Sequence, residues 1–161
     1  MRRNKRILFL ILLGFCLPSF LFAGTFLGVS QGQQSTTLEV GILNRRAEQH
    51  LSFSLPTVCT NPKDYYKAPS VAATISVRTL RFRPVVIAGG IKSQISWECT
   101  NGYILGLGGS VTLSYEFIGK GGVLFLEGSY LPWVTTQGSL STDLGEKQLQ
   151  QWIYIGYRHV F

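Results

Sequence analysis

The residues best able to do chemistry in this chain are a few well-separated charges. They stand in segments that otherwise contain mainly Gly, Ser, Thr, Ala and apolar residues. If they share one enclosed face they must be ion-paired, because a buried charge without a partner is very costly. We therefore expect an interior salt-bridge network that plugs the space it occupies; a gated or selective path is the alternative. The expected members are Glu39, Lys92, Glu116, Glu127 and Arg158, with Arg78 beside them.

The elements that must position these charges are short segments of strictly alternating character. In the clearest one, 103–117, apolar residues such as Leu105, Val111 and Leu113 alternate with Gly, Ser and Thr, and Glu116 falls on the polar face. This period of two predicts antiparallel strands. The phase slips near Arg78–Leu80, where we expect a β-bulge. The eight predicted strands are 25–31, 35–43, 50–58, 70–78, 84–97, 103–117, 122–133 and 151–161.

The polar faces of these strands indicate which side of the sheet meets water. A water-soluble barrel of the lipocalin kind would solvate its polar face with many charges, whereas here that face carries about one charge per strand. Small residues suit the crowded inside of an eight-stranded barrel. We therefore predict an all-β, eight-stranded antiparallel up-and-down transmembrane β-barrel; a secreted β-sandwich is the alternative. Aromatic residues near the strand ends would form interfacial girdles: Trp97, Tyr103, Tyr115, Phe117 and Tyr157.

The N-terminus has the pattern of an export leader. Four basic residues within the first six precede an apolar run that ends at Ala23. This order predicts a signal peptide over 1–23 and a barrel over 24–161. Phe15 directly before Cys16 does not fit a lipoprotein signal. Removing four of the fifteen basic residues leaves 11 basic and 8 acidic residues, a net charge of +3 that gives no case for nucleic-acid binding.

The C-terminus, Gly156-Tyr157-Arg158-His159-Val160-Phe161, resembles the last strand of bacterial outer-membrane proteins. That pattern ends in Phe, is usually aromatic where His159 stands, and is read by the barrel-assembly machinery. With the leader and the strand number, residues 24–161 resemble the small eight-stranded barrels of the OmpA, OmpX and OmpW type. The resemblance implies a bacterial outer-membrane location, with outer-membrane lipid and lipopolysaccharide as neighbours.

The resemblance also implies a topology in which both termini are periplasmic. The connections near 44–49, 82–84 and 118–121 then face the periplasm, and those near 31–34, 59–69, 98–102 and 134–149 face outward. The periplasmic set is mostly short, and the two longest connections are external, as is typical of such barrels.

Two cysteines fall on the external side of this topology. Cys59 and Cys99 each begin a Cys-Thr-Asn tripeptide. An even number of cysteines in an exported chain favours a disulfide; two free thiols are the alternative. The pair is too sparse for a metal site, which needs clustered ligands, and we expect no cofactor.

The external segment 59–69 carries residues suited to surface contacts. Lys63 and Lys67 flank the aromatic pair Tyr65 and Tyr66. This arrangement could contact anionic lipopolysaccharide, a surface glycan or a host protein. A solvated loop with ordinary interfacial residues is the alternative.

These observations lead us to expect a barrel without enzymatic activity, with a structural or surface-interaction role. A narrow, porin-like channel for small or hydrophobic solutes is the alternative that the OmpW resemblance implies. Barrel enzymes that modify lipid A use a His with a Ser and an acid near the outer surface. Here we place His50 in a periplasmic turn and His159 on the lipid face near the periplasmic rim, so no such site can be assembled.

Overall fold

The computed structural model describes most of the region predicted to form the barrel. The described residues are 24–33, 35–56, 69–98, 102–117, 119, 121–136, 139–140 and 153–161. The predicted leader over 1–23, the predicted disulfide between Cys59 and Cys99, and the predicted contact residues Lys63, Tyr65, Tyr66 and Lys67 lie outside them.

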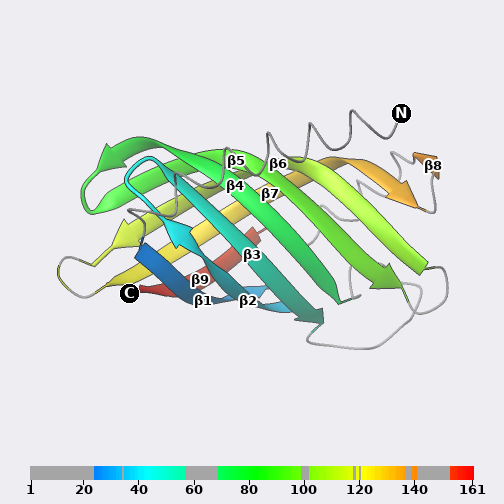
Figure 1. Ribbon diagram of the computed structural model, residues 1–161, viewed down its shortest axis with the longest axis horizontal. Helices are drawn as coiled ribbons and strands as arrows, with labels where there is room; N and C mark the ends of the chain where they lie inside the picture. The colour runs from blue at the N-terminus through cyan, green and yellow to red at the C-terminus, as the bar shows by residue number, and fades with distance from the viewer. Residues whose placement is uncertain are drawn as a thin grey trace, which may run out of the picture.

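The described residues form nine strands and a closed antiparallel barrel (Figure 1). Neighbours in sequence are neighbours in space, and the pairing of β1 with β9 closes the wall. The short β8 only extends the end of β7, so eight strands make the barrel, and the predicted all-β, eight-stranded antiparallel architecture is confirmed. Among the described residues, no helix is long and apolar enough to cross a membrane. The strands are β1 (Gly24–Gly32), β2 (Ser35–Leu43), β3 (Ala47–Pro56), β4 (Ser70–Phe82), β5 (Val85–Glu98), β6 (Gly102–Glu116), β7 (Gly122–Thr136), β8 (Ser139–Leu140) and β9 (Ile153–Val160).

The two ends of the barrel differ in their connections. The backbone amide of Phe161 donates to the carbonyl of Thr25, so the start of β1 and the end of the chain lie at one end, which we call the terminal end (left in Figure 1). The turns between β2 and β3, β4 and β5, and β6 and β7 lie at the same end and are short. The connections at the opposite end include the two longest. The predicted asymmetry of the connections is therefore present.

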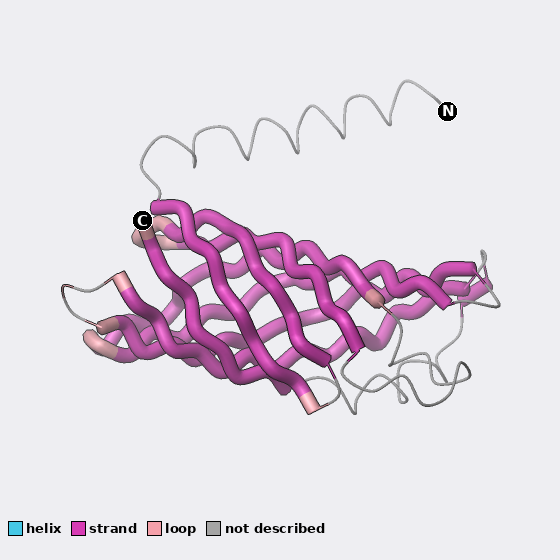
Figure 2. The backbone as a smooth tube through the Cα atoms, turned by 90° about the horizontal axis from the view of Figure 1, so that it is seen from below, coloured by secondary structure: helices cyan, strands magenta, loops and turns pink. Residues whose placement is uncertain are grey.

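The strands are strongly tilted around the barrel (Figure 2). The stagger can be measured by starting at Gly28 on β1 and moving from each residue to its pairing partner on the next strand. Through β2, β3, β4 and β5, this path reaches β6 at Gly106. In the other direction, through β9 and β7, it reaches β6 at Glu116. The two paths thus arrive ten residues apart, at positions 106 and 116. An eight-stranded barrel with a stagger of this kind is just wide enough inside for side chains to fill it.

The alternation predicted from the sequence decides which side chains enter that interior. Along β6, Val111 is 57% exposed on the outer face, and the next residue, Thr112, is fully buried inside. Large apolar residues face outward on all eight barrel strands, as predicted. The inner face also holds large apolar side chains that we had not placed there, because we expected a lumen of small and polar residues. These include Phe26, Val86, Phe125, Leu131, Val134 and Tyr154.

Two irregularities interrupt the pairing of strands. The register of β4 against β5 shifts between Arg78 and Leu80, which confirms the predicted bulge. A second shift, between β6 and β7, was not predicted: Leu107 pairs with Trp133 and Gly109 with Tyr130. Pro132 lies within this shift, where its missing amide hydrogen interrupts the ladder least.

One strand begins earlier than the sequence suggested. The Asn44 side chain accepts hydrogen bonds from the amides of Arg46 and Ala47 at 2.8 and 2.6 Å, and this local bonding completes the turn within three residues. β3 therefore starts at Ala47 instead of near position 50. His50 consequently lies in the wall with its side chain buried, and its predicted place in a turn is wrong.

Candidate functional site: a buried ion network

The guanidinium group of Arg158, on β9, is the centre of a buried ion network inside the barrel. Its Nε atom lies 2.8 Å from Oε2 of Glu39 on β2. Its Nη1 atom lies 3.5 Å from Oε1 of Glu48 on β3, and its Nη2 atom lies 3.8 Å from Oε2 of Glu127 on β7. Each of these four residues is at most 5% exposed. One arginine therefore ties β9 to β2, β3 and β7.

Glu127 is the second point at which charges meet. Its Oε1 atom accepts a hydrogen bond of 2.7 Å from Nζ of Lys92 on β5. Its Oε2 atom lies 3.6 Å from Nε2 of His50. Glu127 is 2% exposed, so its ion pairs with Lys92 and Arg158 form away from water, where charge-charge attraction is strong. Lys92, His50 and Arg158 all face the same carboxylate.

Aromatic rings pack against the two cations and fill the remaining width of the lumen. The Arg158 guanidinium carbon lies 3.9 Å from the ring centre of Phe125 and 4.9 Å from that of Phe26. The Lys92 ammonium lies 5.0 Å from the ring centre of Tyr154. Such contacts stabilise cations in desolvated sites. Together, ions and rings form a layer across the barrel.

Glycines on the inner face make room for these rings. A Cβ atom added at Gly41 would lie 2.6 Å from Cζ of Phe26, and one added at Gly156 would lie 2.6 Å from Cζ of Phe125. Both distances are shorter than real Cβ contacts. The rings can therefore lie against the wall only because these two positions lack side chains.

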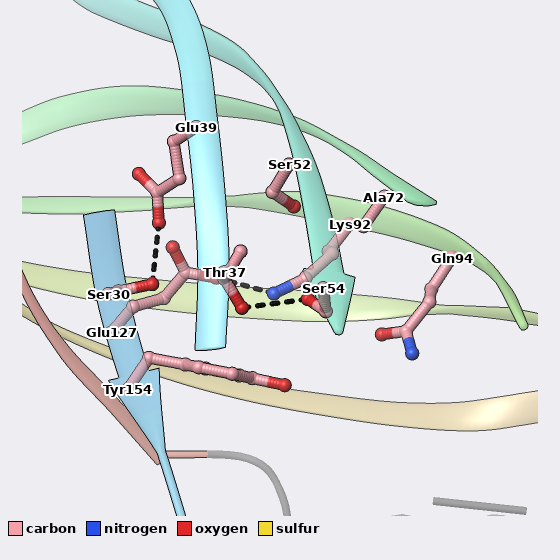
Figure 3. A pocket seen from close by; sticks show the side chains of 10 residues that line it. All are labelled: Ser30, Thr37, Glu39, Ser52, Ser54, Ala72, Lys92, Gln94, Glu127 and Tyr154. Carbon is pink, nitrogen blue, oxygen red and sulfur yellow. Dashed lines mark hydrogen bonds and ion pairs between the residues drawn. The ribbon is translucent and has the colours of Figure 1, made fainter. Parts of the chain in front are cut away.

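A small polar cavity adjoins the network (Figure 3). Ser30 donates to Oε1 of Glu39 at 3.1 Å, and the hydroxyls of Thr37 and Ser54 are 2.7 Å apart. The labelled side chains in Figure 3 come from strands all around the wall and converge on this space. Its volume is about 10 Å³, close to that of one water probe. The network therefore leaves little free cross-section at this level of the barrel.

Arg78 and Glu116 form a second, separate ion pair toward the terminal end. The Arg78 side chain also donates from Nη1 to the carbonyl of Asn44 at 3.1 Å. The Glu116 side chain is 25% exposed, unlike the acids of the main network. The structure thus brings the predicted residues Glu39, Lys92, Glu127 and Arg158 together in one network. It pairs the other two, Arg78 and Glu116, near the turns.

Sequence reasoning missed two members of the main network, Glu48 and His50. Both are an even number of residues from Ser52, a polar residue of the predicted strand 50–58, so extending the alternation of this strand backward would have placed them on the same face as Ser52. The expected turn over 44–49 prevented that extension.

The network contains three carboxylates and two permanent cations. Glu39, Glu48 and Glu127 face Lys92 and Arg158, and one bound proton would make the set neutral. Donor atoms of Glu39, His50 and Glu127 lie within 4.8 Å of one another, a spacing that a metal ion could use. Lys92 and Arg158 already bond these carboxylates and would repel a metal cation. The two carboxylates are therefore better suited to ion pairing than to metal binding.

Comparisons with protein-family models, with curated protein sequences and with solved structures found no match to this chain.

Proposed function

We propose that this protein is an integral barrel of the bacterial outer membrane, closed inside by the ion network, with a structural or surface-interaction role. The observation that carries the proposal is the apolar outer surface. In water, an exposed apolar patch of more than a few hundred Å² is unusual for a monomer. Here large apolar side chains are exposed on every barrel strand. An environment of lipid chains is the one that matches such a surface.

The distribution of charge supports the same conclusion. Among the described side chains, every Asp, Glu, Lys or Arg on a strand is buried in the lumen, except for residues close to the terminal end. The outer wall between the two ends therefore carries only uncharged residues and His159 in the part of the chain described. A charged side chain at the middle of a membrane costs about 2–4 kcal/mol, which explains this distribution.

Strand length and closure also fit a membrane. A tilted strand crosses the hydrocarbon layer with about 9–11 residues, and the barrel strands have between 8 and 15 described residues. The described strands close on themselves through the pairing of β1 with β9, and a sheet closed in this way has no free first and last strand, whose unpaired edges lipid could not satisfy.

The closed lumen favours a role at the surface over one in transport. The ion network and its rings occupy the interior, and the adjoining cavity holds about 10 Å³. We propose that the barrel instead carries its long connections to the cell surface, where Lys63, Tyr65, Tyr66 and Lys67 would contact lipopolysaccharide or another surface ligand.

Membrane fractionation combined with protease treatment of intact cells tests this proposal. We expect the protein in the outer-membrane fraction, with cleavage restricted to the connections opposite the terminal end. Recovery in a water-soluble fraction, or cleavage in the turns at the terminal end, would refute it. Planar-bilayer recordings test the closed lumen: we expect no large, stable conductance.

A further inference from the structure

Four arginines gather at the terminal end, outside the ion network. Arg45 and Arg46 lie in the turn between β2 and β3, Arg81 lies near the end of β4, and Arg83 lies in the next turn. We call these four residues the arginine cluster. Arg45, Arg46 and Arg83 are exposed, and Arg81 is partly so.

The backbone holds the members of the arginine cluster close together. β3 and β4 are adjacent, so the two turns are neighbours around the rim. Nη1 of Arg81 donates to the carbonyl of Arg45 at 3.1 Å, which places Arg81 beside the first turn. Arg81 is repelled electrostatically by Arg78, Arg83 and Arg45 and is attracted by Glu116. Like charges held this close favour an anion that can lie between them.

The described residues provide little negative charge to balance the cluster. At this end, Glu116 is the one described acidic side chain that is not fully buried, and it bonds Arg78. Arg83 and Glu116 line a hollow of about 250 Å³ together with Pro84, Phe117 and Gly119. The hollow is large enough for a phosphate group with its ester carbons.

The wall next to the arginine cluster is apolar. Leu80 and Phe82, on the same strand as Arg81, are exposed on the outer surface, and Phe82 is 70% exposed. Phe117 is also exposed and lines the hollow. Basic groups at a rim with apolar side chains directly beneath match the two parts of a lipid, because the headgroup is charged and the chains are not.

We infer that the arginine cluster binds the phosphate of anionic phospholipids in the membrane leaflet at the terminal end. Arginine suits this ligand because its planar guanidinium group can bond two phosphate oxygens at once. The acyl chains of the bound lipid would then lie along Leu80 and Phe82. The inference rests on the proposed membrane location.

Native mass spectrometry of the protein purified from membranes tests the inference. The protein is titrated with phosphatidylglycerol and, separately, with phosphatidylcholine, and the two binding constants are compared. We expect phosphatidylglycerol to bind more tightly. A basic residue near an anionic lipid surface contributes about 1 kcal/mol, so Arg83→Gln should reduce the preference by about fivefold. Arg45→Gln combined with Arg46→Gln should reduce it further.

Matched variants separate the site from total charge and from folding. Lys147→Gln removes one positive charge from the segment between β8 and β9, outside the arginine cluster, and should leave the preference unchanged. Arg83→Lys keeps the charge and should retain most of it. Heat-modifiable migration on gels establishes that each variant forms the barrel; should Arg83→Gln fail to do so, the Arg45 and Arg46 variant decides.

The possible outcomes are distinct. Equal binding of the two lipids, or an unchanged preference in the arginine variants, would overturn the inference while leaving the membrane proposal intact. Displacement of phosphatidylglycerol by inorganic phosphate at similar concentration would also overturn it, because a lipid site depends on the acyl chains. Failure of the protein to enter membranes would instead refute the proposed function.

Discussion

The inner and outer faces of the barrel wall are built from the same strands and have opposite chemistry. On β7, Glu127 is buried and ion-paired, whereas its neighbour Leu126 is exposed on the outside. A water-soluble barrel has the reverse arrangement. The alternating pattern alone therefore does not distinguish a membrane barrel from a water-soluble one. The face on which the charged residues lie does distinguish them, and here it supports the proposed membrane setting.

The two faces also differ in how tightly they constrain substitutions. Inside, charges, rings and glycines depend on one another within a few ångströms. Outside, each side chain projects away from the wall into what we propose is lipid. Substitutions on the two faces should therefore destabilise the barrel for different reasons.

The largest effect is expected for Glu127→Gln. This change leaves Lys92 and part of Arg158 buried without their shared counter-charge, and removing one partner of a buried ion pair costs about 3–5 kcal/mol. Urea unfolding of the refolded protein in lipid vesicles measures the loss. Adding Lys92→Met to the variant should recover part of it, since the unpaired ammonium is removed. If the double variant is no more stable than the single one, the network does not act as described.

A charge on the outer face should have the next largest effect. Val111 lies near the middle of β6 and faces outward. In a membrane, Val111→Arg should reduce the free energy of unfolding by about 2–4 kcal/mol, and Val111→Leu should change it little. The same vesicle-based urea titration measures both variants. A barrel whose outer face met water would tolerate the arginine, and that result would remove the main support for a membrane location.

Two glycine substitutions test the packing inside the lumen without introducing charge. Gly156→Ala would press a methyl group onto the backbone carbonyl of Val29 and the ring of Phe125, so we expect a loss of about 1–3 kcal/mol. Gly89 has no neighbour within 4 Å of an added Cβ, so Gly89→Ala should be neutral or slightly stabilising. Unfolding free energies of the two variants, measured side by side, test this. Equal losses would mean that packing inside the lumen is not the cause.

The smallest effect is expected at the ion pair near the terminal end. The Glu116 side chain is partly exposed, and its partner Arg78 would still donate a hydrogen bond to the carbonyl of Asn44 in a Glu116 variant. Glu116→Gln should therefore cost about 1 kcal/mol, and added salt should reduce the difference from the unmodified protein. A loss as large as that of Glu127→Gln would show that the Arg78–Glu116 pair contributes as much to stability as the buried network, which contradicts this prediction.

The sequence allowed the faces of the wall to be predicted, but not the contacts inside it. The alternation along each strand placed Glu39, Lys92, Glu127 and Arg158 on one face, because strand geometry alone decides to which face each residue points. Which of them meet depends on the stagger of the strands, and alternation carries no information about stagger. Phe26 and Phe125 were not placed inside, because large apolar residues resemble those of the outer face and only their position in the alternation distinguishes them.

Contact between the outer face and lipid chains can be tested with a single fluorescent side chain. A variant in which Trp97, Trp133 and Trp152 are replaced by Phe and Val111 by Trp reports from one outward position near the middle of β6. In vesicles, we predict that lipids with brominated acyl chains quench its fluorescence strongly and that iodide in the water does not. Quenching by iodide without quenching by the brominated chains would contradict the central claim.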